Sequence, residues 1–264
     1  MEDPTTSPTT TSTTTMTITP TTTTAIIRTR RPTTTSTTTR KPPTTTTKRP
    51  KCVGHQYDIY LVVERQQQVD MPTAVANFIK HFESGSGFGQ ARFGARFNGI
   101  PEEKIDLAAY STPEAFMMKF VGKNGVPSIS LVEAGNLLQR VYFHDMKKAP
   151  PRNTKNLHKI VLMFHNSNDG ANSYAVEGKK AADAGMKTYV LNYGSGYRWG
   201  ATQLANGMSR QVQSAANLAT SATALKKIAE DIMKEDPCFI ERKQKSKKCC
   251  SKGNQCSRNS ELCG

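Results

Sequence analysis

The sequence has 264 residues and a formal net charge of +15 at pH 7, and half of its first fifty residues are threonine. A segment of that composition cannot bury enough apolar surface to form a core, so we expect a single folded domain in the remainder. The chain has no run of 18 apolar residues, which excludes a membrane-spanning helix. It also lacks a zinc-finger spacing or an RNA-binding sheet motif, which argues against nucleic acid as a partner.

Residues 1–51 contain mainly Thr, Pro and Ser with scattered Arg and Lys. This composition predicts a disordered, mucin-like stalk that carries O-linked sugars, although a plain disordered linker would have the same composition. Because O-glycosylation requires the secretory route, the stalk favours a secreted protein. The first residues, MEDPTTSP, lack the basic and apolar regions of a signal peptide, as a mature chain or a fragment also would.

The apolar run YDIYLVV, residues 57–63, ends abruptly in the charged and amide-rich turn ERQQQV. Seven residues with almost no polar interruption predict a strand that is buried on both faces, as in the centre of a parallel sheet. A helix is predicted over residues 70–83. Its apolar face would contain Val69, Ala74, Phe78, Ile79 and Phe82.

Strands and helices alternate through the rest of the domain. The patterns predict strands over residues 91–97, 102–110, 158–165 and 186–194, and an edge strand over 211–218. They predict helices over residues 111–120, 131–143, 173–184 and 223–234, with a loop over 121–130 and a short helical piece over 202–208. This alternation is typical of a doubly wound α/β sheet.

Over residues 52–238 the sequence resembles a von Willebrand factor type A domain. The resemblance is carried by YDIYLVV, by FGARF followed by IDLAAYSTPEAFMMKF, and by SISLVEAGNLLQRVYF, HKIVLMFHNSNDG and AADAGMKTYVLNYG. It implies a Rossmann-like, mostly parallel sheet flanked by helices, with ligands at the carboxyl ends of the strands. The chain would then consist of a stalk over 1–51, this domain over 52–238 and a basic, cysteine-rich tail over 239–264.

Many members of that family bind a divalent cation at this edge through carboxylate and hydroxyl oxygens from three loops. Here the first loop has Glu64, Gln66 and Gln68, the second offers Ser128, and the strand that precedes the third ends in His165 where an Asp would stand. Only Ser128 keeps a hydroxyl group. The resemblance therefore implies a degenerate metal-ion-dependent adhesion site, and we expect no bound cation and no other cofactor.

Three other hypotheses use the same residues. A transition metal would need more ligands than Glu64, His165 and two glutamine amides supply. Ser128, His165 and Glu64 are the residue types of a hydrolase triad, but no nucleophile elbow or oxyanion-hole motif accompanies them, so we predict no catalytic residue and no enzyme activity. Asp169 could replace the missing carboxylate, yet it lies four residues past the strand. A network of hydrogen-bonded polar side chains is the favoured interpretation.

Tyr197, Arg198 and Trp199 form the centre of the glycine-flanked segment SGYRWG. Aromatic and Arg side chains anchor many protein interfaces, so this trio is a candidate partner-binding contact on a loop. The alternative interpretation is that these residues are partly buried and fill the space beneath the loop.

Six cysteines permit complete pairing, which favours an oxidising compartment. Cys52 and Cys238 stand at the two borders of the predicted domain and can form a clasp across its ends, although two free thiols would also fit. The four others allow three pairings and predict a small disulfide knot, the opening of a larger cysteine-rich module cut off at Gly264, or disulfide-linked multimers. The paired C-x-x-C spacing of a zinc site is lacking. They are Cys249, Cys250, Cys256 and Cys263.

These features predict a non-enzymatic, secreted protein of the extracellular matrix. The resemblance implies adhesion to a matrix protein, collagen foremost, and the degenerate site implies that binding needs no metal. Residues 1–51 have eight Lys or Arg against two acidic residues, and residues 239–264 have seven against two, so both tails would attract acidic glycans. The alternative is a structural or mineral-associated scaffold that has no discrete ligand and is cross-linked through its cysteine-rich tail.

Overall fold

The computed structural model describes one folded unit, and the bounds of its elements are given below. The described residues are 54–83, 91–99, 103–127, 131–152, 156–168, 173–240 and 243–244. The predicted stalk and the four tail cysteines lie outside them.

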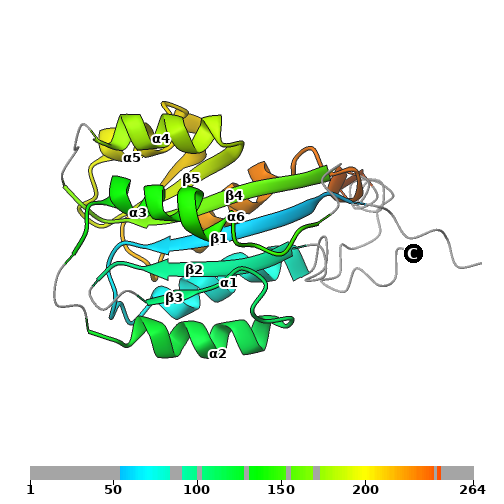
Figure 1. Ribbon diagram of the computed structural model, residues 1–264, viewed down its shortest axis with the longest axis horizontal. Coiled ribbons are helices and arrows are strands. Elements are labelled where there is room, and N and C mark those ends of the chain that lie inside the picture. The colour runs from blue at the N-terminus through cyan, green and yellow to red at the C-terminus, as the bar shows by residue number, and fades with distance from the viewer. Residues whose placement is uncertain are drawn as a thin grey trace, which may run out of the picture. The chain divides into compact units, whose positions relative to one another are not determined.

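A six-stranded sheet forms the centre of this unit, in the order β3-β2-β1-β4-β5-β6 (Figure 1). Every neighbouring pair is parallel except β2 and β3, which are antiparallel. This confirms the predicted mostly parallel, doubly wound sheet. The strands are β1 (Gln56–Val63), β2 (Ala91–Phe97), β3 (Glu103–Ile105), β4 (Leu157–His165), β5 (Met186–Tyr193) and β6 (Val212–Ala215).

Helices cover both faces of the sheet (Figure 1). One face packs against α1 (Met71–Glu83), α2 (Pro113–Asn124) and α6 (Ala222–Met233). The other packs against α3 (Ala134–Arg140), α4 (Ser173–Asp183) and α5 (Arg198–Leu204). A π-helical turn, Val141–Asp145, extends α3, and a short 3-10 helix, Ser209–Gln211, precedes β6.

The continuous apolar run of β1 follows from this layering. Ile59 and Leu61 point into the layer of α1, α2 and α6, whereas Tyr60 and Val62 point into the layer of α3, α4 and α5. Because successive strand residues face opposite sides and both sides are covered, every one of these positions is buried.

Two predictions for the first half of the domain are wrong. Val69 lies in the turn before α1 and is 91% exposed, so it does not belong to the apolar face of the helix. The strand predicted over residues 102–110 is limited to β3, because the chain turns at Ala108, which has a φ of 64°.

Two helix boundaries also differ from the prediction. Helix α2 runs on to Asn124, so the first part of the loop predicted over residues 121–130 is helical. Helix α3 begins at Ala134, and Leu131 lies before it with 56% of its surface exposed. Both differences arise from tertiary contacts of the neighbouring loops, which are described below. Such contacts cannot be predicted from the local periodicity of the sequence.

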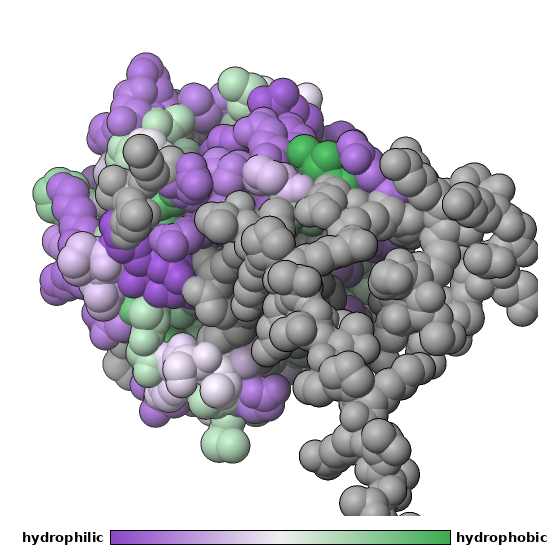
Figure 2. Space-filling model, turned by 90° about the vertical axis from the view of Figure 1, so that its right-hand side faces the viewer, coloured by the Kyte–Doolittle hydropathy of each residue, from purple (hydrophilic) through white to green (hydrophobic). Residues whose placement is uncertain are grey.

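The two borders of the domain meet at the amino ends of the strands. The carboxylate of Asp236, which follows α6, accepts hydrogen bonds from the Tyr57 hydroxyl (2.9 Å) and the His55 backbone N–H (3.1 Å). Figure 2 shows this face, whose described residues are mostly hydrophilic with small, separate hydrophobic areas. Cys238 is buried here and is disulfide-bonded. Cys52 lies outside the described residues, so the clasp between them stays a prediction.

Candidate functional site

A hollow of about 190 Å³ lies at the carboxyl ends of the central strands, the edge that the resemblance implied. Parallel strands bring the segments that follow them to one edge, where open α/β sheets bind their ligands. The residues that line the hollow are Glu64, Arg65, Asn98, Leu131, Val132, Glu133, Ser167 and Tyr174.

The turn after β1 is anchored to the end of α2. Gln67 adopts a φ of 58°, and its backbone N–H donates to the Asn124 carbonyl oxygen at 2.8 Å. The Asn124 side-chain amide donates in return to the Gln68 carbonyl oxygen at 3.2 Å. This conformation buries Glu64 and Gln66 and exposes Arg65. Asn124 was not predicted to lie here, because the sequence pattern indicated a loop where α2 continues.

Glu64 links β1 to β4. Its Oε2 atom accepts a hydrogen bond of 2.6 Å from the backbone N–H of Asn166. The same oxygen lies 3.1 Å from Nδ1 of His165, which makes no hydrogen bond with another described residue although the imidazole is fully buried. The His165 ring stands edge-on to Tyr174, with ring centres 6.1 Å apart. The structure therefore brings Glu64 and His165 together, and it commits the carboxylate to a contact within the protein.

Asn98, which follows β2, holds the segment before α3. Its side-chain amide donates to the Val132 carbonyl oxygen and its Oδ1 accepts from the Val132 N–H, both at 2.7 Å. Glu133 then accepts a hydrogen bond from the Ser173 hydroxyl at 3.2 Å, at the start of α4. Asn98 was not predicted, although a polar residue directly after a buried strand is the signal that points to such a role.

The edge has a rim of exposed side chains at the start of α5. Tyr197 and Trp199 are about half exposed, at 49% and 51%, and their rings lie 6.1 Å apart. The Tyr197 N–H donates to the carbonyl oxygen of Ser167, which lines the hollow, at 2.8 Å. The prediction that the trio lies on a loop is wrong, because Arg198 and Trp199 form the first turn of a helix.

Glu64 and Arg65 act electrostatically on the Tyr193 hydroxyl at this edge. Burial, and then the charge of Glu64, raise the pKa of the Tyr193 hydroxyl far above its usual value, while Arg65 opposes the shift. Tyr193 is therefore neutral at physiological pH. Neither Arg65 nor Arg198 forms an ion pair with another described residue, so both positive charges remain available at the surface.

The described side chains do not fit a hard divalent cation. Such ions take several carboxylate, carbonyl or hydroxyl oxygens. Here the Glu64 carboxylate already accepts a hydrogen bond from the Asn166 backbone N–H, and His165 offers only nitrogen. Within the described part of the chain no cluster of three His, Cys, Asp or Glu side chains could hold a metal ion. Ser128 and Asp169 lie outside it, so the structure gives no geometry for a hydrolase triad or a replacement carboxylate.

No protein-family model and no curated protein matches the sequence. Among solved structures, the chain is similar to proximal thread matrix protein 1 from the mussel byssus, with a TM-score of 0.54 and 20% identity. The match covers 68% of this chain and 48% of that one, so the chain spans about half the length of the byssal protein. Another structure of that protein has a zinc-occupied metal-ion-dependent adhesion site.

Two bacterial proteins share the architecture. The pilus adhesin SpaC from Lactobacillus rhamnosus GG has a TM-score of 0.51 and 12% identity, covering 68% of this chain and 30% of that one. BatB from Bacteroides thetaiotaomicron has a TM-score of 0.51 and 11% identity, covering 68% and 98%. All three have von Willebrand factor type A-like folds. The chain therefore has this fold, as the sequence predicted.

Proposed function

We propose that this protein is a secreted, non-enzymatic matrix or adhesion component that binds a protein partner, fibrillar collagen foremost, at the carboxyl edge of its sheet without a metal ion. A byssal thread matrix protein and a pilus adhesin with the same fold support a matrix or adhesion role. Within the described residues, no helix is long and apolar enough to cross a membrane.

The observation that carries the proposal is the pairing of exposed aromatic rings with unpaired cations beside the hollow. Trp199 and Tyr197 offer large, rigid contact surfaces, and Arg65 and Arg198 add charge and hydrogen-bond donors. Trp, Tyr and Arg are the residues that contribute most to protein–protein binding energy. Both residues are about half exposed, which supports a role in partner contact and not one as a buried plug beneath a loop.

Solid-phase binding of the full chain to fibrillar collagen, in magnesium and then in EDTA, tests the proposal. We expect equal binding in both, because Glu64 is committed to Asn166 and His165. Replacing Trp199 with Ala should weaken binding about tenfold or more, the effect of losing an interface anchor. Met118→Ala on α2 is the matched control, since Met118 is also exposed (78%) but lies on another element.

Loss of binding in EDTA would show that the edge does hold a metal, and unchanged binding of Trp199→Ala would place the contact elsewhere. Absence of collagen binding under all conditions would favour the scaffold alternative. In that case a non-reducing gel should show multimers that disappear when the four tail cysteines are replaced with Ser.

A further inference from the structure

A cavity of about 200 Å³ opens between α1 and α6, which pack side by side on one face of the sheet. Each helix contributes three lining residues, α1 from its second half and α6 from its first two turns. They are Asn77, Lys80, His81, Ala222, Thr223 and Lys226. The volume is smaller than that of most small-molecule sites, about 300–1,000 Å³, so the cavity suits one small group of a larger ligand.

Both helices bring positive charge to this cavity. Lys80 on α1 and Lys226 on α6 are exposed, and none of the described lining residues is acidic. The Lys80 ammonium group donates a hydrogen bond of 2.6 Å to Oδ1 of Asn77, an uncharged side chain that also lines the cavity. Lys226 forms no ion pair with another described residue. The lining is therefore suited to an anion.

The half-buried imidazole of His81 lies within the field of both lysines. Burial, and then the charges of Lys80 and Lys226, lower the pKa of His81 below its ordinary value of 6.5, while Glu230 on α6 opposes the shift. The three basic groups therefore come together from two helices. Like charges held close to one another repel, and a bound anion would remove that cost. Glu230 does not line the cavity, and its carboxylate lies 3.8 Å from Nζ of Lys243.

The kinds of basic residue indicate the kind of anion. The described lining has lysine and histidine but no arginine. Arginine binds a planar carboxylate with two parallel hydrogen bonds, whereas lysine acts as a point charge and suits an oxyanion whose oxygens point in several directions. Lys227, the next residue on α6, is exposed and adds positive charge outside the cavity. A ligand with repeated anionic groups is therefore favoured over a single ion.

We propose that this cavity binds a sulfate ester group of an acidic polysaccharide. Lys80 and Lys226 would hold the sulfate oxygens by charge-assisted hydrogen bonds, and the Thr223 hydroxyl and the His81 ring would supply further donors. The site is separate from the proposed partner-binding edge, because Trp199 belongs to α5 on the other face of the sheet. Its failure would leave the proposed adhesive function untouched.

The test is NMR titration of the isotope-labelled full chain with a sulfated heparin tetrasaccharide, since a residue-resolved signal separates the cavity from the basic tails. We expect saturable shifts of the His81 ring and of the Thr223 and Lys226 amides. The desulfated tetrasaccharide should cause no shifts there, and inorganic sulfate should bind about tenfold more weakly or worse. Equal binding of inorganic sulfate would identify a free ion as the ligand, and tighter binding of O-phosphoserine a phosphate ester. Either result would overturn the proposal.

The pKa of His81 gives a second readout in the same experiment. A bound anion stabilises the imidazolium form, so saturation with the tetrasaccharide should raise this pKa. By linkage, affinity should increase as the pH falls from 7.5 to 5.5. Of the charged groups around the ring, Lys80 and Lys226 oppose its protonation in the free protein and Glu230 favours it. A pKa that does not change at saturation would contradict the proposed site.

Variants at the cavity complete the test. Lys226→Ala should weaken binding of the tetrasaccharide about fivefold or more, whereas Lys119→Ala, at an exposed position on α2, should not. His81→Gln cannot take up a proton and should abolish the increase in affinity at low pH. Lys226 is exposed, so its replacement should leave the fold intact, and thermal unfolding checks this. Shifts confined to the tails, or equal affinity of Lys226→Ala and the native chain, would overturn the proposal.

Discussion

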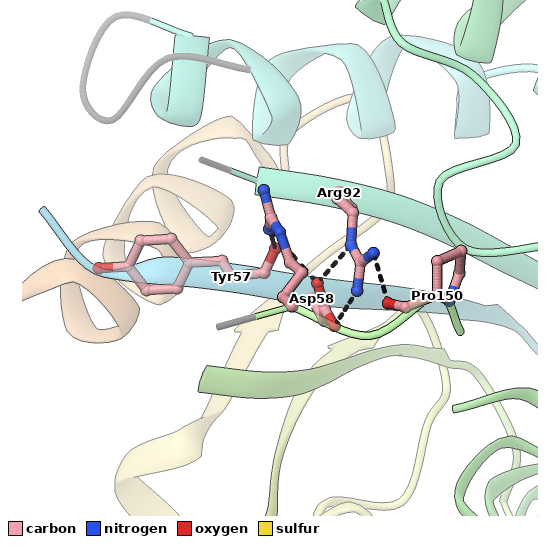
Figure 3. A network of polar contacts seen from close by, with 5 residues as sticks. Tyr57, Asp58, Arg92 and Pro150 are labelled. Atoms are coloured by element: carbon pink, nitrogen blue, oxygen red, sulfur yellow. Dashed lines mark hydrogen bonds and ion pairs between the residues drawn. The ribbon is translucent and has the colours of Figure 1, made fainter. Parts of the chain in front are cut away.

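Asp58 is a charged residue within the apolar run of the central strand β1, and two arginines contact it. Arg92 on β2 forms a two-pronged ion pair with it, at 2.8 and 2.6 Å, and also donates to the Pro150 carbonyl oxygen at 2.8 Å (Figure 3). Arg152 approaches the same carboxylate at 3.5 Å. The carboxylate is 3% exposed, so these ion pairs replace most of its contact with water.

We expect Asp58→Asn to lower the free energy of unfolding by about 3 kcal/mol or more, because it removes the buried carboxylate that forms the two-pronged ion pair with Arg92. Urea denaturation measures the effect. Asp183→Asn is the control: it removes an acid from the exposed pair with Lys179, which should cost no more than about 0.5 kcal/mol. Similar losses in both variants would show that the Asp58 cluster contributes no more than a surface pair.

His158 makes stability depend on pH. Burial, and then His55 and Lys187, lower its pKa below the ordinary value of 6.5, while Glu235 and Asp236 oppose the shift. Its ring stacks on that of His55, with centres 4.5 Å apart. The unfolded chain therefore takes up this proton at a higher pH than the folded chain does, and stability falls as pH drops from about 6.5 through the lower folded-state value.

Thermal unfolding at pH 7.5 and pH 5 checks this effect. We expect the midpoint to fall at pH 5, and His158→Phe to show a smaller fall than the native chain. His144→Gln, at an exposed position on another element, should leave the difference unchanged. An unaltered pH dependence in His158→Phe would contradict the assignment.

At the scale of elements, α4 packs against α5 with almost no space between the backbones. A Cβ atom on Gly178 would lie 2.3 Å from the Gln203 carbonyl oxygen and 2.9 Å from that of Leu204. Both are backbone atoms, so they can move away only if the helices separate.

We therefore expect Gly178→Ala to destabilise the protein by about 1–3 kcal/mol, measured by urea denaturation. Gly122→Ala is its matched control, because Gly122 lies in α2 and a Cβ atom there would meet nothing within 4 Å. That change should stabilise the protein by about 0.5–1 kcal/mol through the better helix propensity of Ala. Equal effects of the two substitutions would mean that the close approach of α4 and α5 is not retained.

At the scale of the whole molecule, hydrogen bonds to Asp236 connect the start of the first strand with the segment that follows α6. These bonds lie within a few residues of both cysteines of the predicted clasp. If Cys52 and Cys238 pair, the loop that they close spans nearly the entire domain. The chain-entropy model then assigns the bond an upper limit of roughly 4–5 kcal/mol.

Replacing Cys52 with Ser should accordingly lower the denaturation midpoint, and a reducing agent should lower that of the native chain but not that of the variant. The control replaces the four tail cysteines with Ser, which should leave the midpoint unchanged. A midpoint of the Cys52→Ser variant equal to that of the native chain would show that the clasp does not form.

Several features of the candidate edge could be predicted from the sequence. The apolar run before Glu64 and the run that ends in His165 predicted two buried strands, and the family resemblance implied that the segments after them meet at one edge. The trio at Tyr197 was recognised as a candidate contact from its residue types, and that role stays a prediction. Its helical conformation and its link to Ser167 were not predicted, because a hydrogen bond across thirty residues leaves no periodic pattern.

The sequence by itself determined the layered α/β fold, since burial on both faces requires continuous apolar strands, and helices require a repeating apolar face. Only the tertiary structure decided which polar groups are paired. Glu64 bonds a backbone group 102 residues away, Asp58 pairs with an arginine 34 residues away, and the buried Thr188 hydroxyl has no hydrogen-bond partner among the described residues. The physical reason is that strand and helix patterns arise from neighbouring residues, whereas the partner of a buried polar group depends on how distant segments pack.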